Sequence, residues 1–251
     1  MSMSMEQIEM YCKKAEAYRQ CNNAIGKYIQ LLYTVQFKEM IDLFALDTPG
    51  AWVEMVWGRY DERKGIETLY LDLHEKMNNE PGMMSIHTVC TPVIEVADDC
   101  KTAKGVFLSP GVETYVNGNM AIEGSHCDWC WIKYDTEFVC EDGVWKIWHL
   151  RTVGIFQTDY HHDWIETASQ GLHENPNADY HVDWLEPGWE PDGPVVRIDE
   201  RYRIDKLMPN DPPMPKPYAT YDGYERFGIA VNRPDGTIIE RPWDMTYRNG
   251  N

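Results

Sequence analysis

Apolar residues recur at every third or fourth position along residues 5–33, and this spacing predicts one long helix. The series is Ile8, Tyr11, Ala15, Tyr18, Ile25, Ile29 and Leu32. The same spacing predicts a helix over residues 64–79, which ends before Pro81-Gly82. A shorter helix is expected between these two, from Gln36 to Leu46, because the turn residues Thr48-Pro49-Gly50 follow it.

Beyond residue 84 the pattern changes to runs of β-branched and aromatic residues bounded by turn signals. Strands are predicted over residues 84–96, 101–116, 121–140 and 144–157, with a short earlier strand over residues 51–57. Asn117-Gly118-Asn119 and Asp142-Gly143 predict hairpin turns, and Pro110-Gly111 predicts a bulge or bend within a strand. Helices followed by hairpin-connected strands predict an α+β architecture with an antiparallel sheet.

The last predicted strand carries apolar residues on both faces. By the period of two, one face holds Trp145, Ile147, His149, Arg151 and Val153, and the other holds Trp148, Leu150 and Thr152. This pattern is typical of a central strand covered on both sides. His149 and Arg151 then stand on a partly apolar face, where a buried charge needs a partner or a ligand.

Composition changes near residue 160, since 11 of the 15 prolines lie beyond it. We therefore expect residues 1–165 to form the domain and residues 166–251 to form an extended arm with little regular structure. The arm is rich in tryptophan and tyrosine, which argues against a disordered tail. It is expected to pack along its own domain or along a neighbouring subunit, and a proline-rich segment loses little entropy when it docks.

The formal net charge is −18, which argues against binding to nucleic acid or to an anionic membrane surface. No stretch approaches 18 apolar residues, and the first residues have neither a basic region nor an apolar run. The seven cysteines are odd in number and scattered, which favours reduced core thiols over a disulfide framework. These features predict a cytoplasmic protein.

Four short segments, in this order, resemble motifs of the SnoaL-like branch of the nuclear transport factor 2-like superfamily. They are Gly26-Lys-Tyr28 with Phe37 and Leu43-Phe44, His87-Thr-Val-Cys-Thr-Pro92-Val-Ile-Glu, Asp98-Asp-Cys-Lys-Thr-Ala103-Lys-Gly, and Asp142-Gly-Val-Trp-Lys-Ile147. The resemblance covers roughly residues 5–165. It implies a cone-shaped, strongly bent antiparallel sheet covered by three N-terminal helices, with a pocket between them.

Enzymes of this branch transfer protons at a carbon next to a carbonyl group, in an apolar pocket and without a metal. The resemblance therefore implies no cofactor for this chain. It further implies that the Tyr28 hydroxyl polarises a carbonyl oxygen or protonates a leaving hydroxyl, and that His87 moves the proton. The residues alone leave a second interpretation open for each: a core aromatic on a helix face and a hydrogen-bonded core histidine.

The sequence departs from the family pattern at Tyr33, which stands where dehydratase relatives have an aspartate. Either the chemistry differs or another carboxylate takes over, and Asp128 is the candidate, with a solvated strand charge as the alternative. Arg151 is a second catalytic candidate, because a guanidinium could bind a carboxylate or enolate oxygen. Further substrate-binding candidates are Tyr33, Trp57, Tyr134 and His149.

Metal binding is not expected. Cys127 and Cys130 form a lone CxxC, and on a strand their side chains point to opposite faces. The near-repeat of residues 159–166 at 179–186 offers His161, His162, Asp163, His181 and Asp183. Its spacing matches no known metal site, so surface turns are the default interpretation.

The leading hypothesis is a cofactor-independent lyase of the dehydratase type, or an isomerase, acting on a small apolar carbonyl-bearing ring compound. No nucleotide-binding or nucleophile motif is present in the sequence. The alternative is a non-catalytic domain that binds a small ligand or serves oligomeric assembly. Self-association as a dimer or trimer, through the sheet and the arm, is expected under either hypothesis.

Overall fold

The computed structural model of this 251-residue chain describes residues 3–55, 57–116, 124–169, 185–193, 196–197, 202, 204, 212–223, 230–232 and 238–239. Helices and strands follow one another in the predicted order. The helical elements are α1 (Met5–Tyr33), α2 (Phe37–Ile41), α3 (Glu62–Glu67), the π-helical segment η1 (Thr68–His74), α4 (Glu75–Asn78) and α5 (Trp164–Ser169). None of them is long and apolar enough to cross a membrane.

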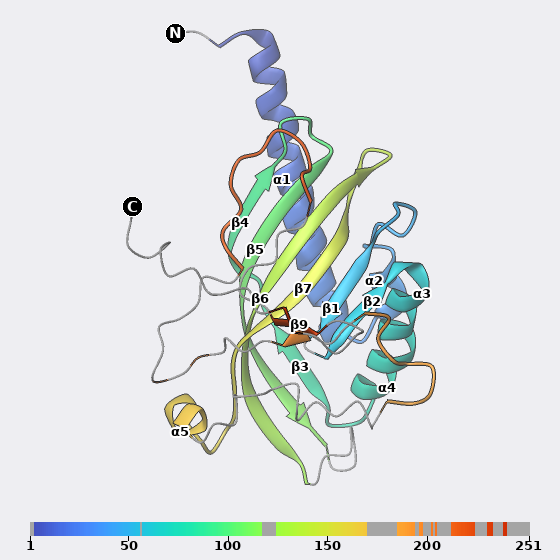
Figure 1. Cartoon of the computed structure of the whole chain (residues 1–251), viewed down its shortest axis with the longest axis vertical. Coiled ribbons are helices and arrows are strands. Elements are labelled where there is room, and N and C mark those ends of the chain that lie inside the picture. The colour runs from blue at the N-terminus through green and yellow to red at the C-terminus, as the bar shows by residue number, and fades with distance from the viewer. Residues whose placement is uncertain are drawn as a thin grey trace.

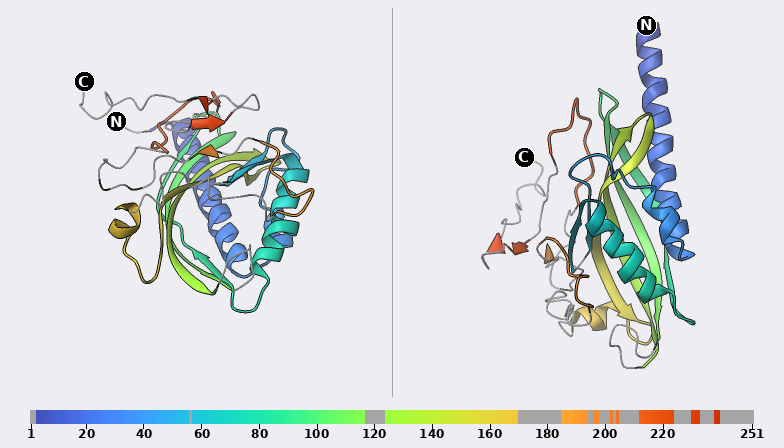
Figure 2. Two further views of the ribbon diagram at one scale, coloured as in Figure 1. Left: turned by 60° about the horizontal axis from the view of Figure 1, so that its bottom comes forward. Right: turned by 90° about the vertical axis from the view of Figure 1, so that its right-hand side faces the viewer.

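The main sheet has seven strands and is bent without closing on itself. They are β1 (Trp52–Met55), β2 (Gly58–Asp61), β3 (Met84–His87), β4 (Cys90–Val96), β5 (Thr102–Tyr115), β6 (His126–Glu141) and β7 (Val144–Asp159). Their order is β2-β1-β7-β6-β5-β3, and β4 also pairs with β5. Figure 2 shows the sheet curving around α1, while α3, η1 and α4 cover the open side. The predicted α+β cone is confirmed.

Helix α1 has the predicted bounds, and its ends explain them. The Ser4 side chain accepts a hydrogen bond from the Gln7 backbone N–H at 3.2 Å, and the Gln7 side chain accepts one from the Ser4 N–H at 2.9 Å. This reciprocal cap satisfies two donors at the helix start. The first turns of α1 extend beyond the sheet (Figure 1), and its later turns bury one face of small and apolar residues against the sheet.

Helix α2 is shorter than predicted because the chain after it pairs with the sheet. The Ala45 N–H donates to the Ile147 carbonyl at 2.7 Å, and the Ile147 N–H donates to the Leu43 carbonyl at 2.9 Å. Those backbone groups are therefore engaged with β7 and do not continue a helix. One strand pair also departs from the expected antiparallel pattern, since β1 runs parallel to β7.

Strand β7 contains an extra residue that changes which side chains share a face. Glu137 pairs with His149 and Phe138 pairs with Ile147, so Trp148 is left over as a β-bulge. Side chains before the bulge and after it alternate with opposite parity. The predicted common face of Ile147, His149 and Arg151 is therefore wrong: Ile147 points into the core, and the other two point to the outer face.

Two segments of the proline-rich region pack against the domain of their own chain. The Gly193 N–H donates to the Arg59 carbonyl at 2.9 Å, beside β2. The Asp98 N–H donates to the Tyr218 carbonyl at 3.0 Å, at the turn before β5. A small sheet of β8 (Val196–Arg197), β9 (Ala230–Asn232) and β10 (Ile238–Ile239) also lies in this region. The division of the chain at residue 165 stays a prediction, and α5 spans it.

Candidate active site

A cavity of about 130 Å³ lies inside the cone, between α1, η1 and α4 on one side and the inner face of the sheet on the other. Its apolar walls include Leu32, Met55, Trp57, Met77 and Ile132. Its polar walls include Tyr28, His74, Ser85, His87, Glu113 and Tyr134. Ser85, His87 and Glu113 lie together where β3 and β5 pair, so that part of the cavity suits acid–base chemistry.

His87 and Glu113 are brought together by strand register. β3 and β5 are antiparallel, with Ser85 opposite Glu113 and His87 opposite Gly111. His87 Nε2 lies 3.2 Å from Glu113 Oε1. A Cβ at Gly111 would lie only 2.4 Å from His87 Nδ1, so the imidazole occupies the space that a side chain at Gly111 would fill.

The Glu113 carboxylate receives hydrogen bonds from three side chains. Besides His87, the Tyr115 hydroxyl donates to Oε2 at 2.5 Å and the Ser85 hydroxyl donates to Oε1 at 3.4 Å. Burial acts to raise the pKa of Glu113, but the hydrogen bonds and the charge of His87 outweigh it, and the pKa of Glu113 is lowered. The carboxylate is therefore ionised at neutral pH.

The other ring nitrogen of His87 is left with a lone pair. Because an ionised carboxylate only accepts hydrogen bonds, Nε2 of the neutral imidazole carries the proton and Nδ1 does not. The Ser109 hydroxyl lies 3.5 Å from Nδ1, and Ser109 also hydrogen-bonds to Tyr134. His87 is thus held on both sides, and Nδ1 is its basic atom.

Three buried tyrosines form the wall beside this pair. The hydroxyl groups of Tyr28 and Tyr70 lie 3.0 Å apart. The Tyr28 ring packs edge-on against the rings of Tyr70 and Tyr134, with centroids 6.1 Å and 6.0 Å away. Burial raises the pKa of all three hydroxyls, so they remain protonated donors at neutral pH.

Residues 13–151 match the family model described as the SnoaL-like domain, and this match covers more than half of the chain. The chain belongs to the SnoaL-like domain family. The sequence has no match among curated proteins.

Solved structures share the fold at low sequence identity. LinA is 15% identical, with a TM-score of 0.50 over 60% of this chain and 93% of LinA. The hexachlorocyclohexane dehydrochlorinase LinA-type3 from Novosphingobium barchaimii LL02 is 16% identical, with a TM-score of 0.47 over 58% of this chain and 90% of its own. At these identities the likeness concerns the fold alone.

Four of the residues predicted for the site of this SnoaL-like chain line the cavity: Tyr28, Trp57, His87 and Tyr134. Tyr33, in the last turn of α1, is half exposed and is not part of the cavity wall. Asp128 lies on the inner face of β6 beyond the wall, where it accepts a hydrogen bond from the Gln157 side chain at 2.8 Å. Burial raises the pKa of Asp128, and the carboxylate beside His87 belongs to Glu113.

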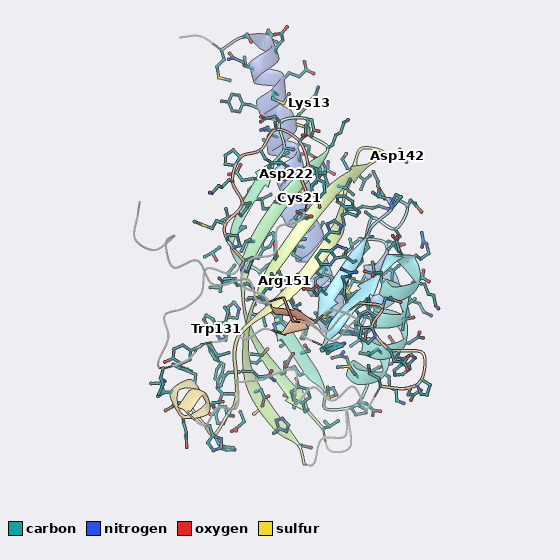
Figure 3. All side chains as sticks on the ribbon, viewed as in Figure 1. Lys13, Cys21, Trp131, Asp142, Arg151 and Asp222 are labelled. Carbon is teal, nitrogen blue, oxygen red and sulfur yellow. The ribbon has the colours of Figure 1, made fainter. Side chains whose placement is uncertain are left out.

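Arg151 and His149 lie on the outer face of the sheet, away from the cavity. Arg151, in the middle of β7 (Figure 3), is 1% exposed, and its Nε lies 3.3 Å from the Glu54 carboxylate. Both nitrogens of His149 are engaged, with Glu137 Oε2 2.6 Å from Nδ1 and the Gly50 carbonyl 2.9 Å from Nε2. The bulge at Trp148 explains this placement, and it separates both residues from His87.

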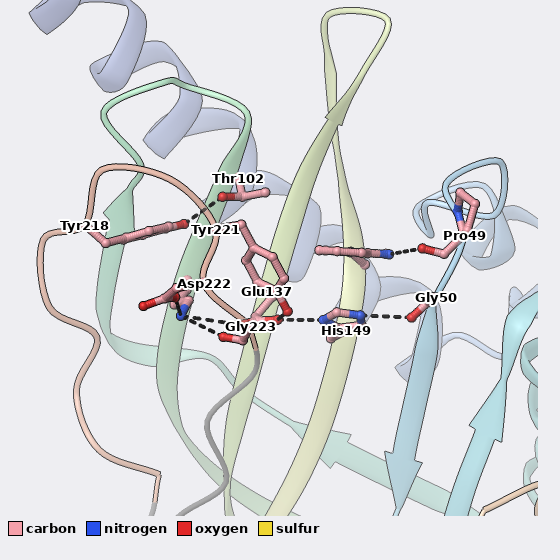
Figure 4. A network of polar contacts seen from close by, with 11 residues as sticks. Pro49, Gly50, Thr102, Glu137, His149, Tyr218, Tyr221, Asp222 and Gly223 are labelled. Atoms are coloured by element: carbon pink, nitrogen blue, oxygen red, sulfur yellow. Dashed lines mark hydrogen bonds and ion pairs between the residues drawn. The ribbon is translucent and has the colours of Figure 1, made fainter.

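The outer network around His149 includes the C-terminal region. The Tyr221 hydroxyl donates to Glu137 Oε2 at 2.9 Å, and Lys104 Nζ donates to Asp222 Oδ1 at 2.9 Å (Figure 4). Residues 212–223 therefore cover this part of the sheet within one chain. His149 and Tyr221 share the Glu137 carboxylate, and His149 does not line the cavity.

One group in the described part of the SnoaL-like chain has metal-ligand spacing. The ligand atoms of His87, Glu113 and Cys130 lie within 4.8 Å of one another. The hydrogen bonds of Glu113 already account for the closeness of His87. Cys127 is exposed and Cys130 is buried, as their opposite faces on the strand predict. His161 and His162 are exposed near α5, and His181 and Asp183 lie outside the described residues.

Sequence reasoning missed Glu113, Ser85, Ser109, Tyr115 and His74. The β5 residues alternate from Ser109 through Gly111 to Glu113 and Tyr115, so the period of two places them on one face. That pattern could have predicted that the β5 residues lie on one face. It could not have predicted that they lie beside His87, because the register between β3 and β5 depends on strands that do not follow each other in the chain.

Proposed function

We propose that this chain is a cofactor-independent lyase of the dehydratase type, or an isomerase, that transfers a proton at the carbon beside a ring carbonyl. The observation that carries the proposal is the pair formed by His87 and Glu113 at the wall of a largely apolar cavity. A histidine held by a carboxylate is suited to general acid–base catalysis, because the carboxylate stabilises the imidazolium that forms.

Each residue has a defined part in the proposed reaction. His87 Nδ1 removes the proton from the carbon next to the carbonyl once the Ser109 hydroxyl turns from Nδ1 to Tyr134, and the ionised Glu113 stabilises the charged ring. Tyr70 donates to the Tyr28 oxygen, which leaves the Tyr28 proton free to bind the carbonyl oxygen as it gains negative charge. The imidazolium then returns its proton. Delivery to a leaving hydroxyl eliminates water, and delivery to a more distant carbon moves the double bond.

Cavity size limits the substrate to about one six-membered ring. The cavity measures about 130 Å³, and an engineered protein cavity of about 150 Å³ binds benzene. Suitable probes are therefore 3-hydroxycyclohexanone, which loses water to give 2-cyclohexenone, and 3-cyclohexenone, which isomerises to the same product. Both reactions are followed by the absorbance of the conjugated product.

The test compares the wild-type chain with His87→Gln and Glu113→Gln. Each substitution is expected to lower the rate by about 100-fold or more, the usual contribution of a general acid–base group. Tyr33→Phe is the matched control, because Tyr33 lies outside the cavity wall, and its rate is expected to equal that of the wild type. Full turnover by His87→Gln would overturn the proposal.

A further inference from the structure

The cavity contains a second histidine, which the proposed proton transfer does not use. His74 is the last residue of η1, on the helical side of the cavity, and its side chain is buried. Its ring packs against Phe37, Trp57 and Tyr70, with centroids 6.0 Å, 6.1 Å and 5.1 Å away. These aromatic neighbours fix the plane of the imidazole and leave it little freedom to turn.

The backbone decides which nitrogen of His74 carries the proton. Nδ1 lies 2.8 Å from the Leu69 carbonyl oxygen, five residues earlier in the chain. A carbonyl oxygen only accepts hydrogen bonds, so Nδ1 is the donor and Nε2 holds the lone pair of a neutral ring. Burial also lowers the pKa of His74 to about 4, so the ring stays neutral at physiological pH.

Nε2 is consequently an acceptor. Among the residues that the structure describes, none donates a hydrogen bond to His74 Nε2. The side chain is only 8% exposed and forms part of the cavity wall. Among the described residues, Nε2 of His74 is not one of the completely enclosed polar atoms without a partner, so a ligand in the cavity can reach it and supply the donor. A π-helical turn is rare in helices and occurs often at functional sites.

We propose that His74 determines specificity by accepting, through Nε2, a hydrogen bond from a hydroxyl or N–H group of the bound ring compound. The inference rests on the proposed function in one respect, that the cavity is where the substrate binds. It defines the substrate class more narrowly: a single ring that has a hydrogen-bond donor at the end facing η1 and a carbonyl toward Tyr28. Fully apolar rings of the same size lack the group that His74 binds.

Phenol and toluene are matched probes for this role, because they have the same shape and differ by one hydroxyl group in place of a methyl group. Their dissociation constants are measured by calorimetry for the wild type and for His74→Phe, which keeps an aromatic ring and removes the acceptor. The variant is expected to bind phenol about tenfold more weakly, the effect of leaving one buried hydrogen bond unmade, with its affinity for toluene unchanged. Equal effects on both ligands would overturn the proposal.

A measurement on the wild type needs no substitution in the core. The ¹⁵N spectrum of histidine-labelled protein should show Nε2 of His74 as an unprotonated nitrogen, and phenol should shift that signal toward a hydrogen-bonded position while toluene should not. The proposal is contradicted if the spectrum shows a protonated Nε2, or if phenol does not shift the Nε2 signal.

The two proposals fail separately. The preference of Tyr33→Phe for phenol over toluene should equal that of the wild type, because Tyr33 lies outside the cavity wall. If the preference for phenol over toluene depends on His74, but the wild type converts neither 3-hydroxycyclohexanone nor 3-cyclohexenone, the inference stands and the proposed reaction fails. If turnover depends on His87 while His74→Phe keeps the phenol preference, the reaction stands and the inference fails.

Discussion

At the scale of single residues, the two cavity histidines differ in the group that faces their rings. His87 Nε2 faces the ionised Glu113 carboxylate, which can stabilise a charged imidazole. His74 Nδ1 donates to a backbone carbonyl, which by itself raises the pKa of the ring, but burial inside the aromatic cage outweighs this effect and keeps the ring neutral. Under the two proposals, one residue type serves two purposes: His87 exchanges protons, and His74 accepts a hydrogen bond.

Burial of His74 predicts a specific dependence of stability on pH. Its pKa in the folded chain is about 4, below the ordinary value near 6.5. As the pH falls below that ordinary value, the unfolded chain binds a proton that the folded chain does not, so the free energy of unfolding decreases. This loss amounts to about 3 kcal/mol by the time the pH reaches the folded pKa.

Urea denaturation at neutral pH and near pH 4.5 measures this loss, with His74→Phe as the comparison. The lowered pKa of Glu113 also makes acid destabilising, because the stabilisation by its carboxylate disappears as the pH falls through its folded pKa. That contribution is common to both proteins. The difference between the pH dependences of the two proteins is therefore the contribution of His74. Identical pH profiles would show that the His74 ring is not held neutral.

At the scale of elements, the site depends on how strands pair. The sequence indicated the positions of β1, β5, β6 and β7, but it missed β2, and the strand predicted over residues 84–96 is two strands, β3 and β4. One bulge at Trp148 also moved Arg151 and His149 to the outer face. A bulge of this kind has no sequence signal here, since Trp148 fits an uninterrupted strand equally well. The β5–β6 register runs unbroken through Pro110-Gly111, so the predicted irregularity is not a bulge in that pairing. The irregularity lies on the other side of β5, where β3 ends and β4 begins.

Gly111 offers a test of the pairing between β3 and β5. A Cβ there would lie 2.4 Å from His87 Nδ1 and 2.8 Å from the Cys130 carbonyl oxygen, so Gly111→Ala must displace the imidazole or the backbone. We expect a loss of about 1–3 kcal/mol in the free energy of unfolding, as for other overpacked cores, and a lower rate of the dehydration described above.

Gly26→Ala is the control for that substitution. A Cβ at Gly26 meets no atom within 4 Å, and the residue lies inside α1. Alanine is favoured over glycine inside a helix, so this variant should gain about 0.5–1 kcal/mol. Denaturation curves for the two variants give the comparison. A Gly111→Ala chain as stable and as active as the Gly26→Ala chain would mean that His87 does not lie over Gly111.

At the scale of the whole molecule, the cone was largely predictable, and the carboxylate beside His87 was not. The helical spacing and hairpin signals indicate an α+β domain, and the resemblance in four short segments indicates the SnoaL-like cone, as the family match confirms. Glu113 stands next to His87 only after two non-consecutive strands pair in one register. A contact of this kind depends on the complete fold.

The measurement that tests the central claim most directly is deuterium incorporation into cyclohexanone in heavy water, followed by NMR. It reports proton transfer at the carbon beside the carbonyl without requiring a leaving group. The account predicts that the wild-type chain accelerates exchange and that Glu113→Gln and His87→Gln each slow it by about 100-fold or more, while Tyr33→Phe does not. Exchange at the wild-type rate in both cavity variants, or no acceleration by the wild-type chain, would contradict the account.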